Sequence, residues 1–252
     1  MARPRIIPVL LLRDSGLVKT VKFKTHKYVG DPINAVKIFN DKEVDELILL
    51  DITASIKKRR PHFGYLKKIA EECFMPLCYG GGISSKSDIK EIIQSGIEKV
   101  SINSAAIENP EFIKAASEDY GSSTIVVAMD VKRNVFGKYT IFIRSGAKNT
   151  HIDPVEHAVR MQEYGAGELL INSIDRDGTY EGYDLTLIKS ITSSVDIPII
   201  SCGGASGFDD LVSVINDGQA SAAAAGSLFV FHGKHRAVLI NYPPYDQIKY
   251  YI

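Results

Sequence analysis

The sequence predicts an α/β fold, a closed (β/α)₈ barrel, and three observations carry that prediction. The chain has 252 residues, close to the roughly 250 that one such barrel needs. Short apolar runs alternate with amphipathic stretches, which is the pattern of parallel strands joined by crossover helices. A shift of 122 residues places Asp31-Pro32 on Asp153-Pro154 and Gly81-Gly82 on Gly203-Gly204. Four β/α units in each half then predict one barrel made of two half-barrels.

We expect a single TIM-barrel domain over residues 1–252, with the half-barrels at about 1–122 and 123–252. A doubly wound open sheet is the alternative architecture. It gives no reason for the two halves of the chain to repeat, so the repeat favours the barrel.

The predicted strands are apolar on both faces, as the strands of a buried parallel sheet are. Their ranges are Ile6–Leu12, Glu46–Asp51, Pro76–Tyr79, Lys99–Ile102, Thr124–Asp130, Glu168–Asn172, Ile197–Ser201 and Ala222–Ala225. The first of them is interrupted by Pro8 and is much shorter than a membrane span. We therefore expect neither a secretion signal nor a transmembrane helix.

Proline at the first helical position, preceded by Asp or Asn, marks three predicted helix starts. These starts are Asp31-Pro32, Asn109-Pro110 and Asp153-Pro154. The segment Lys132–Arg144 differs, because Asn134–Gly137 separates two short extended runs within it. We expect a β-hairpin there, inserted after the fifth strand.

Composition excludes several classes of protein. The 30 basic and 30 acidic residues cancel, so no overall field would draw the chain to nucleic acid or to a membrane. Cys73, Cys78 and Cys202 have neither disulfide nor zinc spacing, which favours a reducing, cytoplasmic location. We expect Cys202 to be a small buried strand residue and not a nucleophile. The six histidines show no His-x-x-x-His spacing, although His232 and His235 are three apart, and we predict no metal and no cofactor.

Glycine-rich turns follow the third and seventh predicted strands, and each is paired with the end of the next strand. The pairs are Gly81-Gly82 with Asn103-Ser104, and Gly203-Gly204 with Gly226-Ser227. Glycine lets backbone N–H groups approach phosphate oxygens, and the loops after strands seven and eight are the usual phosphate site of barrels. We predict two phosphate cradles for a substrate with a phosphate at each end. The alternative is that these glycines only make tight turns.

Carboxylates lie at the carboxyl end of the predicted barrel, where barrel enzymes keep their active sites. Asp130 ends the fifth strand after an apolar run, so burial should raise its pKa into the range of a general acid or base. Capping of the following loop is its alternative role. Asp177 lies in the loop after the sixth strand and is predicted to position substrate, whereas Asp175 is expected to pair with Arg176.

Four charged residues lie at the opposite end of the predicted barrel. Two positive and two negative side chains fall at the starts of strands one, two, four and six: Arg5, Glu46, Lys99 and Glu168. Because side chains alternate along a strand, Arg5 faces the same way as residues 7, 9 and 11. A solvated rim is the ordinary interpretation of such charges. A neutral ring that closes the barrel floor, or opens it to a partner, is the other.

Over essentially its whole length the chain resembles a known family. The segments that carry the resemblance are Arg5-Ile6-Ile7-Pro8, Leu50-Asp51-Ile52-Thr53-Ala54-Ser55, Gly80-Gly81-Gly82-Ile83, Lys99-Val100-Ser101-Ile102-Asn103-Ser104 and Asp175-Arg176-Asp177-Gly178-Thr179. They are similar to the cyclase subunit of imidazole glycerol phosphate synthase. The resemblance implies a glutaminase partner on the barrel floor and a gate there through which ammonia enters, made of the four charged residues. It also implies that Lys19 faces a phosphorylated small-molecule substrate.

One position departs from that family. The resemblance implies two catalytic aspartates, Asp130 and a residue ending strand one, but Leu11 stands at the second position. Asp14 and Lys19 remain in register, so no insertion explains the difference. Leu11 cannot move a proton, and loss of a general acid or base typically costs on the order of 10²- to 10⁴-fold in rate.

The C-terminal segment departs as well. The family has a regular eighth helix, whereas the consecutive prolines of Tyr242-Pro243-Pro244 stop the eighth helix of this chain. We expect His232 and His235 at surface positions early in that helix. With Leu11, this ending resembles a branch of cyclase-like proteins associated with glycosyl amidation in surface-polysaccharide pathways. That resemblance implies a dedicated glutaminase and a third, sugar-binding enzyme, which together turn an acetamido group into an acetamidino group.

The sequence leaves three functions open. The first is an ammonia-using synthase subunit of a glutamine amidotransferase complex that amidates a surface-polysaccharide sugar. The second is the ordinary cyclase of histidine biosynthesis, with an altered but working site. The third is a non-catalytic conduit that docks partners and passes ammonia.

Overall fold

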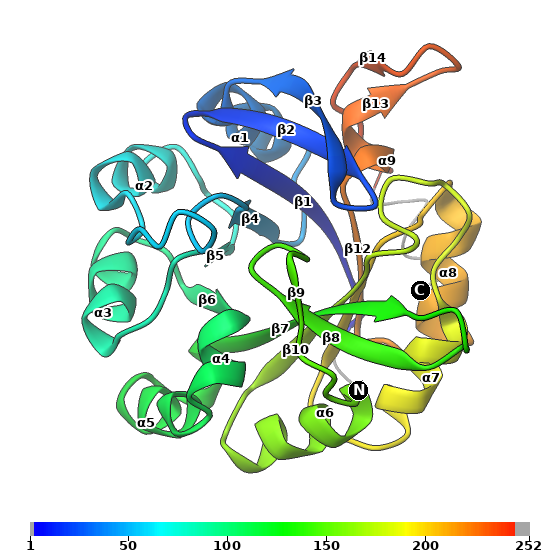
Figure 1. The fold of residues 1–252 in the computed structure, drawn as a ribbon. Coiled ribbons are helices and arrows are strands. Elements are labelled where there is room, and N and C mark those ends of the chain that lie inside the picture. Colours follow the sequence, from blue (N-terminus) through cyan, green and yellow to red (C-terminus); the bar gives the residue numbers. More distant parts are fainter. Residues whose placement is uncertain (1–2, 245–252) are drawn as a thin grey trace.

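Eight parallel strands close into a barrel in the computed structural model, which describes residues 3–244 (Figure 1). The barrel strands are β1 (Arg5–Arg13), β4 (Leu47–Asp51), β5 (Leu77–Gly80), β6 (Lys99–Ile102), β7 (Ile125–Arg133), β10 (Glu168–Ser173), β11 (Ile199–Cys202) and β12 (Ala222–Ala225). The last strand pairs with the first in parallel, with Arg5 opposite Ala222. The predicted fold class is therefore confirmed.

Helices surround the barrel on its outside (Figure 1). Their bounds are α1 (Pro32–Asp41), α2 (Phe63–Ala70), α3 (Lys86–Gln94), α4 (Ser104–Glu108), α5 (Glu111–Tyr120), α6 (Pro154–Glu163), α7 (Leu185–Thr192), α8 (Phe208–Asn216) and α9 (Ser227–Val230), with a 3₁₀ turn at Ser122–Thr124. The main core is the apolar layer between strands and helices, where Phe39 and Met161 are fully buried. Within residues 3–244, every helix falls short of the length and apolarity that a bilayer crossing requires.

Two of the three predicted helix starts are confirmed. The side chains of Asp31 and Asp153 accept backbone N–H groups from the first turns of α1 and α6, at 2.9 and 2.8 Å. At the third, a helix does begin, one residue later at Glu111, but the predicted cap is wrong, because the Asn109 side chain caps nothing at the start of α5. Instead the Asn109 backbone N–H donates to the Ala105 carbonyl at 2.8 Å, so this residue ends the short helix before it.

A smaller apolar cluster fills the barrel itself. Its members are the side chains that point inward in alternation along the strands: Ile7, Val9, Ile48, Cys78, Val126, Leu170, Ile200, Cys202, Ala222 and Ala224, with Leu11, Leu50 and Ala128 packed against them. The predicted shared facing of residues 7, 9 and 11 is therefore confirmed. Between the two ends of the barrel, most of the inward side chains are therefore apolar.

Two β-hairpins extend from the barrel strands. The predicted hairpin after the fifth strand is confirmed, because β7 pairs antiparallel with β8 (Tyr139–Ile143), followed by the short β9 (Lys148–Asn149). The first βα loop forms a second hairpin that the sequence did not predict. It consists of β2 (Gly16–Val21) and β3 (Lys24–Gly30).

The expected eighth helix does not form. After the four residues of α9, the chain makes an antiparallel pair of short strands, β13 (Phe231–His232) and β14 (Ala237–Val238). His232 lies in a strand and His235 in the turn, so their predicted helical placement is wrong. Gly233 takes a φ of 68°, a left-handed conformation that ends a helix and begins a turn.

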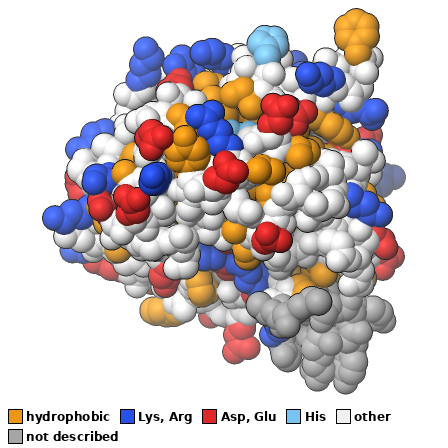
Figure 2. Space-filling view, turned by 90° about the horizontal axis from the view of Figure 1, so that it is seen from below, with side chains coloured by type: hydrophobic (Ala, Val, Ile, Leu, Met, Phe, Trp, Pro, Cys, Tyr) orange, Lys and Arg blue, Asp and Glu red, His pale blue; other side chains and the backbone are white. Residues whose placement is uncertain are grey.

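Charged side chains of both signs are interspersed over the face of the molecule seen from below (Figure 2). This mixture fits the formal net charge of zero. A nucleic-acid surface would need lysine and arginine gathered into a patch or stripe, and this face carries none in the part of the chain that the structure describes.

Candidate active site

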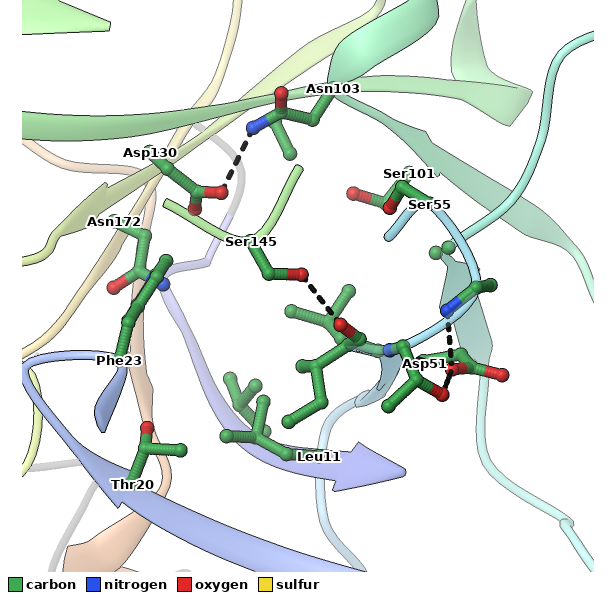
Figure 3. Close-up of a pocket in the computed structure, with 18 of the residues that line it drawn as sticks. Leu11, Thr20, Phe23, Asp51, Ser55, Ser101, Asn103, Asp130, Ser145 and Asn172 are labelled. Carbon is green, nitrogen blue, oxygen red and sulfur yellow. Dashed lines mark hydrogen bonds between the residues drawn. The ribbon is translucent and has the colours of Figure 1, made fainter. Parts of the chain in front are cut away.

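The carboxyl ends of the barrel strands enclose a cavity of about 680 Å³ (Figure 3). Asp130 and Leu11 line it. So does every residue predicted to bind substrate or phosphate: Lys19, Gly81, Gly82, Asn103, Ser104, Asp177, Gly203, Gly204, Gly226 and Ser227. The residues converge because the carboxyl ends of all eight strands meet at one mouth of the barrel.

Asp130 lies on β7 and faces this cavity. Its Oδ2 accepts a hydrogen bond from Asn103 Nδ2 at 3.0 Å (Figure 3). Burial raises the pKa of Asp130 to about 7, the charge of Asp177 raises it further, and a hydrogen bond from Asn172 opposes the rise. A carboxyl group with a pKa near neutrality can both accept and donate a proton at physiological pH.

The other carboxylates in the wall are engaged within the protein. Asp51 forms an ion pair with Arg59 at 2.6 Å. Glu108 pairs with Arg144 at 2.9 Å. Asp177 accepts a hydroxyl hydrogen bond from the β2–β3 hairpin at 2.6 Å. Asp130, whose partners are neutral amides, is therefore the carboxyl group in this wall best suited to proton transfer.

Leu11 presents an apolar surface to the cavity, across the drawn pocket from Asp130 (Figure 3). It pairs in register with Leu50 of the neighbouring strand, and both side chains pack on the apolar barrel interior. The cavity thus has the Asp130 carboxyl group on one side and the apolar side chain of Leu11 on the other.

Asp177 anchors the hairpin that covers one edge of the cavity. Its Oδ2 accepts from Thr20 Oγ1 at 2.6 Å and from the Phe23 backbone N–H at 3.1 Å. Its carbonyl oxygen accepts from the Lys22 N–H at 2.9 Å. Lys22 and Phe23 both have positive φ angles, so these bonds hold a turn that the residues do not favour on their own.

The neighbouring Asp175 does not pair with Arg176 as predicted. Its Oδ2 accepts the Arg133 backbone N–H at 2.7 Å, at the end of β7. Arg176 reaches the other way, to Glu181 at 3.5 Å. A backbone N–H group needs a hydrogen-bond acceptor, and the Asp175 carboxylate is the acceptor for the N–H of Arg133.

Lys19 is buried beside the second glycine-rich turn, with 5 % of its surface exposed. Its ammonium group donates to the Val9 carbonyl. Burial lowers the pKa of Lys19 to about 8, and the charge of Asp177 partly offsets the effect. Gly226 lies directly against the ammonium group, where a side chain would occupy the same space. A buried cation at this point stabilises an anion bound at the turn.

Backbone N–H groups at the predicted cradles are free to bind a ligand. Those of Gly81, Gly82 and Gly204 find no acceptor among residues 3–244. Gly204 has a φ of 109°, and a side chain there would run into the Gly182 carbonyl. Glycine is therefore needed for the turn itself, and the turn leaves N–H groups on the cavity wall that suit phosphate oxygens.

The four predicted charges meet at the other end of the barrel and alternate in sign. Arg5 contacts both Glu46 and Glu168. Lys99 Nζ lies 3.0 Å from Glu46 and 3.1 Å from Glu168. Burial opposes the charge on Lys99, but the two carboxylates outweigh it and raise its pKa. Glu46 is 2 % and Glu168 6 % exposed, and the side chains of Arg5 and Lys99 are 25 % and 21 % exposed, so the ring has buried carboxylates and half-buried cations and is not a solvated rim.

Sequence reasoning missed two polar residues that line the cavity. Ser101 Oγ and Asn172 Oδ1 are buried without a hydrogen-bond partner among the described residues. Ser101 follows Lys99 by two positions and Asn172 follows Glu168 by four. Strand alternation applied to the ring residues would therefore have found both.

Cys202 also lines the cavity but is not activated. It ends β11 with 9 % of its surface exposed, and burial raises the pKa of its thiol to about 12. A protonated thiol is a weak nucleophile, so the expectation of an inert strand residue holds.

Fold and cavity together define a (β/α)₈ barrel whose polar side chains gather at the carboxyl ends of the strands, where barrel enzymes keep their active sites. Sequence comparison is more specific. The chain belongs to the histidine biosynthesis protein family, whose model matches residues 5–236.

Several relatives match almost over their whole length. The chain is 50% identical over 248 residues to the "Putative imidazole glycerol phosphate synthase subunit hisF2" of Pseudomonas aeruginosa, covering 98% of this chain and 99% of that protein. It is 50% identical over 244 residues to the subunit named hisF3 of Vibrio vulnificus, covering 96% and 94%. It is 44% identical over 232 residues to the imidazole glycerol phosphate synthase subunit HisF of Alkaliphilus metalliredigens, covering 92% of each. The predicted resemblance to HisF-type cyclase subunits is confirmed, and the glycosyl-amidation branch stays a prediction.

Proposed function

We propose that this protein is the ammonia-using subunit of a glutamine amidotransferase complex that converts an acetamido group of a surface-polysaccharide sugar into an acetamidino group. The observation that supports this proposal most strongly is the combination of a complete charge ring at one end of the barrel with Leu11 at the other end. The ring supports ammonia supply from a glutaminase. Leu11 argues against the two-aspartate reaction of the ordinary cyclase, because an apolar side chain stands where the resemblance implies the second catalytic aspartate.

The barrel interior suits the passage of neutral ammonia. Above the ring, the inward side chains are apolar, and several are small, such as Ala222 and Ala224. An apolar passage disfavours ammonium and other ions, whose transfer from water is costly. The unpartnered oxygens of Ser101 and Asn172, which line the cavity, can accept hydrogen bonds from the arriving nitrogen.

Contact with the glutaminase is assigned to the amino ends of the strands. Phe74 lies in the loop that leads into β5 at this end and is 85 % exposed. An exposed aromatic residue at the same end of the barrel as the charge ring is a suitable anchor for a partner protein.

Asp130 is assigned as the base that takes a proton from ammonia while the nitrogen attacks the acetamido carbon. Its pKa of about 7 leaves a substantial fraction ionised at neutral pH. The carbonyl oxygen must leave as water, and we assign its activation to the third, sugar-binding enzyme. The glycine-rich turns and Lys19 hold the phosphate of the substrate.

The test is a reconstituted complex of this chain, a glutaminase and the sugar-binding enzyme. We expect Lys99→Met to lower glutamine-dependent turnover at least about tenfold and to leave turnover with saturating ammonium salt unchanged. Lys138→Met, at an exposed lysine far from the ring, is the matched control. Unchanged glutamine-dependent turnover when free ammonia is limiting would contradict the gate. Full activity of Asp130→Asn in the same complex would favour a conduit without chemistry.

The cyclase of histidine biosynthesis is the second candidate, favoured by the 44% identity to a HisF subunit. Purified protein, ammonium salt and the bisphosphorylated imidazole precursor test it directly. We expect no imidazole product from the wild-type chain and measurable product from Leu11→Asp. Product formation by the wild-type chain would establish this second function.

A further inference from the structure

A second cavity opens beside the active site at the C-terminal hairpin. It has a volume of about 400 Å³ and is lined by Tyr180, Ser206, Leu228, Phe231, His232, Gly233, Lys234, Arg236 and Asn241. Tyr180 and Leu228 line the active-site cavity as well, so the two cavities share a wall. The hairpin that builds this cavity stands where an eighth helix was expected.

The lining is basic and carries no carboxylate. His232, Lys234 and Arg236 belong to it, and none of the three forms an ion pair within residues 3–244. Arg236 stacks on the ring of Tyr180 at 4.8 Å. Lys27, from the β2–β3 hairpin, adds a neighbouring cation by donating to the Arg236 carbonyl at 2.7 Å. Local positive charge without an ion-pair partner attracts an anion.

Tyr180 connects this cavity to the predicted phosphate cradle. Its hydroxyl donates to the Ser227 carbonyl at 3.2 Å, directly at the turn formed by Gly226 and Ser227. The ring of the same residue contacts Arg236. A ligand whose phosphate occupies the cradle can therefore extend past Tyr180 toward the basic hairpin.

We propose that the second cavity binds a diphosphate group of the substrate, separate from the phosphate held at the cradle; that the substrate is a sugar rests on the proposed function. The volume exceeds the needs of a single phosphate, and the hairpin offers several cations within one cavity. Lysine and arginine both bind phosphate, and charge-assisted hydrogen bonds are about twice as strong as neutral ones. The inference concerns binding alone and goes beyond the proposed amidation. It is measured without turnover, so either can fail while the other stands.

Titration calorimetry at fixed ionic strength, with inorganic phosphate, pyrophosphate and uridine diphosphate as probes, tests this inference. We expect pyrophosphate to bind more tightly than phosphate, and Lys234→Ala and Arg236→Ala each to weaken pyrophosphate binding about tenfold. Lys138→Ala, in the turn between β7 and β8, is the matched control and should leave the pyrophosphate affinity unchanged. Lys19→Met should weaken phosphate binding at the cradle and spare most of the pyrophosphate affinity.

Both hairpin substitutions lie at exposed positions, so the unfolding temperature should match that of the wild-type chain. Tighter binding of uridine diphosphate than of pyrophosphate identifies a nucleotide-linked substrate. Equal affinities for uridine diphosphate and pyrophosphate show that the cavity contacts the diphosphate and not the base, as it would for a lipid-linked sugar. The inference is overturned if pyrophosphate does not bind, or if its affinity depends on Lys19 and not on Lys234 or Arg236.

Discussion

At the residue scale, the catalytic candidate Asp130 is a group that destabilises the fold when ionised. Its pKa rises from the ordinary 3.8 to about 7 in the native state because of burial. The native state therefore holds the proton more tightly than the unfolded chain, and stability falls as pH rises from about 3.8 to about 7. We expect Asp130→Asn to be more stable than the wild type at pH 8 by roughly 2–4 kcal/mol, and by far less at pH 4.

Urea unfolding of both proteins at these two pH values measures the difference. The side chain in Asp130→Asn keeps an oxygen that accepts the hydrogen bond from Asn103, so loss of this bond does not contribute to the stability difference. An equal stability difference at pH 4 and pH 8 would show that the Asp130 carboxyl is not perturbed. The same residue would then be a poor candidate for proton transfer.

His157 gives the opposite pH dependence. It is 4 % exposed on α6, its Nε2 has no partner among the described residues, and burial lowers its pKa to about 4. The unfolded chain binds the proton more readily, so stability is complete above about pH 6.5 and falls between there and about pH 4. We expect the wild type to lose about 3 kcal/mol by this route.

His157→Phe, which keeps the apolar ring in the core, should lack this loss. Thermal unfolding from pH 7 to pH 4 compares the two proteins. Parallel curves would show that His157 is not the titrating group. The comparison isolates the titration of His157, because all other titratable groups are the same in both proteins.

At the element scale, the capping bonds separate two apparently equivalent helix starts. Asp153 accepts two backbone N–H groups of α6, at 2.8 and 3.3 Å, whereas the Asn109 side chain caps nothing at α5. We expect Asp153→Ala to lower the free energy of unfolding by about 1 kcal/mol. Asn109→Ala, the matched control, should be neutral. Equal losses in denaturant unfolding would contradict the assignment.

Elements with local signals could be predicted from the sequence, and elements held by distant contacts could not. The barrel strands and the Asp31 and Asp153 caps depend on their own residues. The β2–β3 hairpin does not: β3 is largely exposed and has no alternation, and its turn is held by Asp177. The C-terminal hairpin was missed for a similar reason, since only the left-handed Gly233 marks it locally.

The same distinction holds for the site. The repeat located both glycine-rich turns, and the places of charged residues at the starts and ends of the predicted strands located the ring and Asp130. The second cavity could not be predicted, because its walls come from separate segments of the chain. Lys27 and Arg236, which meet beside it, are 209 residues apart in the sequence.

At the scale of the whole molecule, the charge ring ties strands from both halves of the barrel together. Arg5 and Lys99 each contact Glu46 and Glu168, so every member has two partners of opposite sign. Removing one cation leaves two buried carboxylates with a single partner. We expect Lys99→Met to lower the free energy of unfolding by about 3 kcal/mol, since breaking a buried pair leaves an uncompensated charge.

Adding Glu46→Gln to Lys99→Met restores a neutral ring with one Arg and one Glu. The double variant should therefore be less destabilised than the sum of the two single variants, by about 1–3 kcal/mol in a double-mutant cycle measured with urea. Additive effects would mean that the four residues do not act as one electrostatic unit. If the double variant is folded and stable, its glutamine-dependent turnover should still be low, because two members of the ring are missing. The loss then reflects the passage of ammonia and not the stability of the barrel.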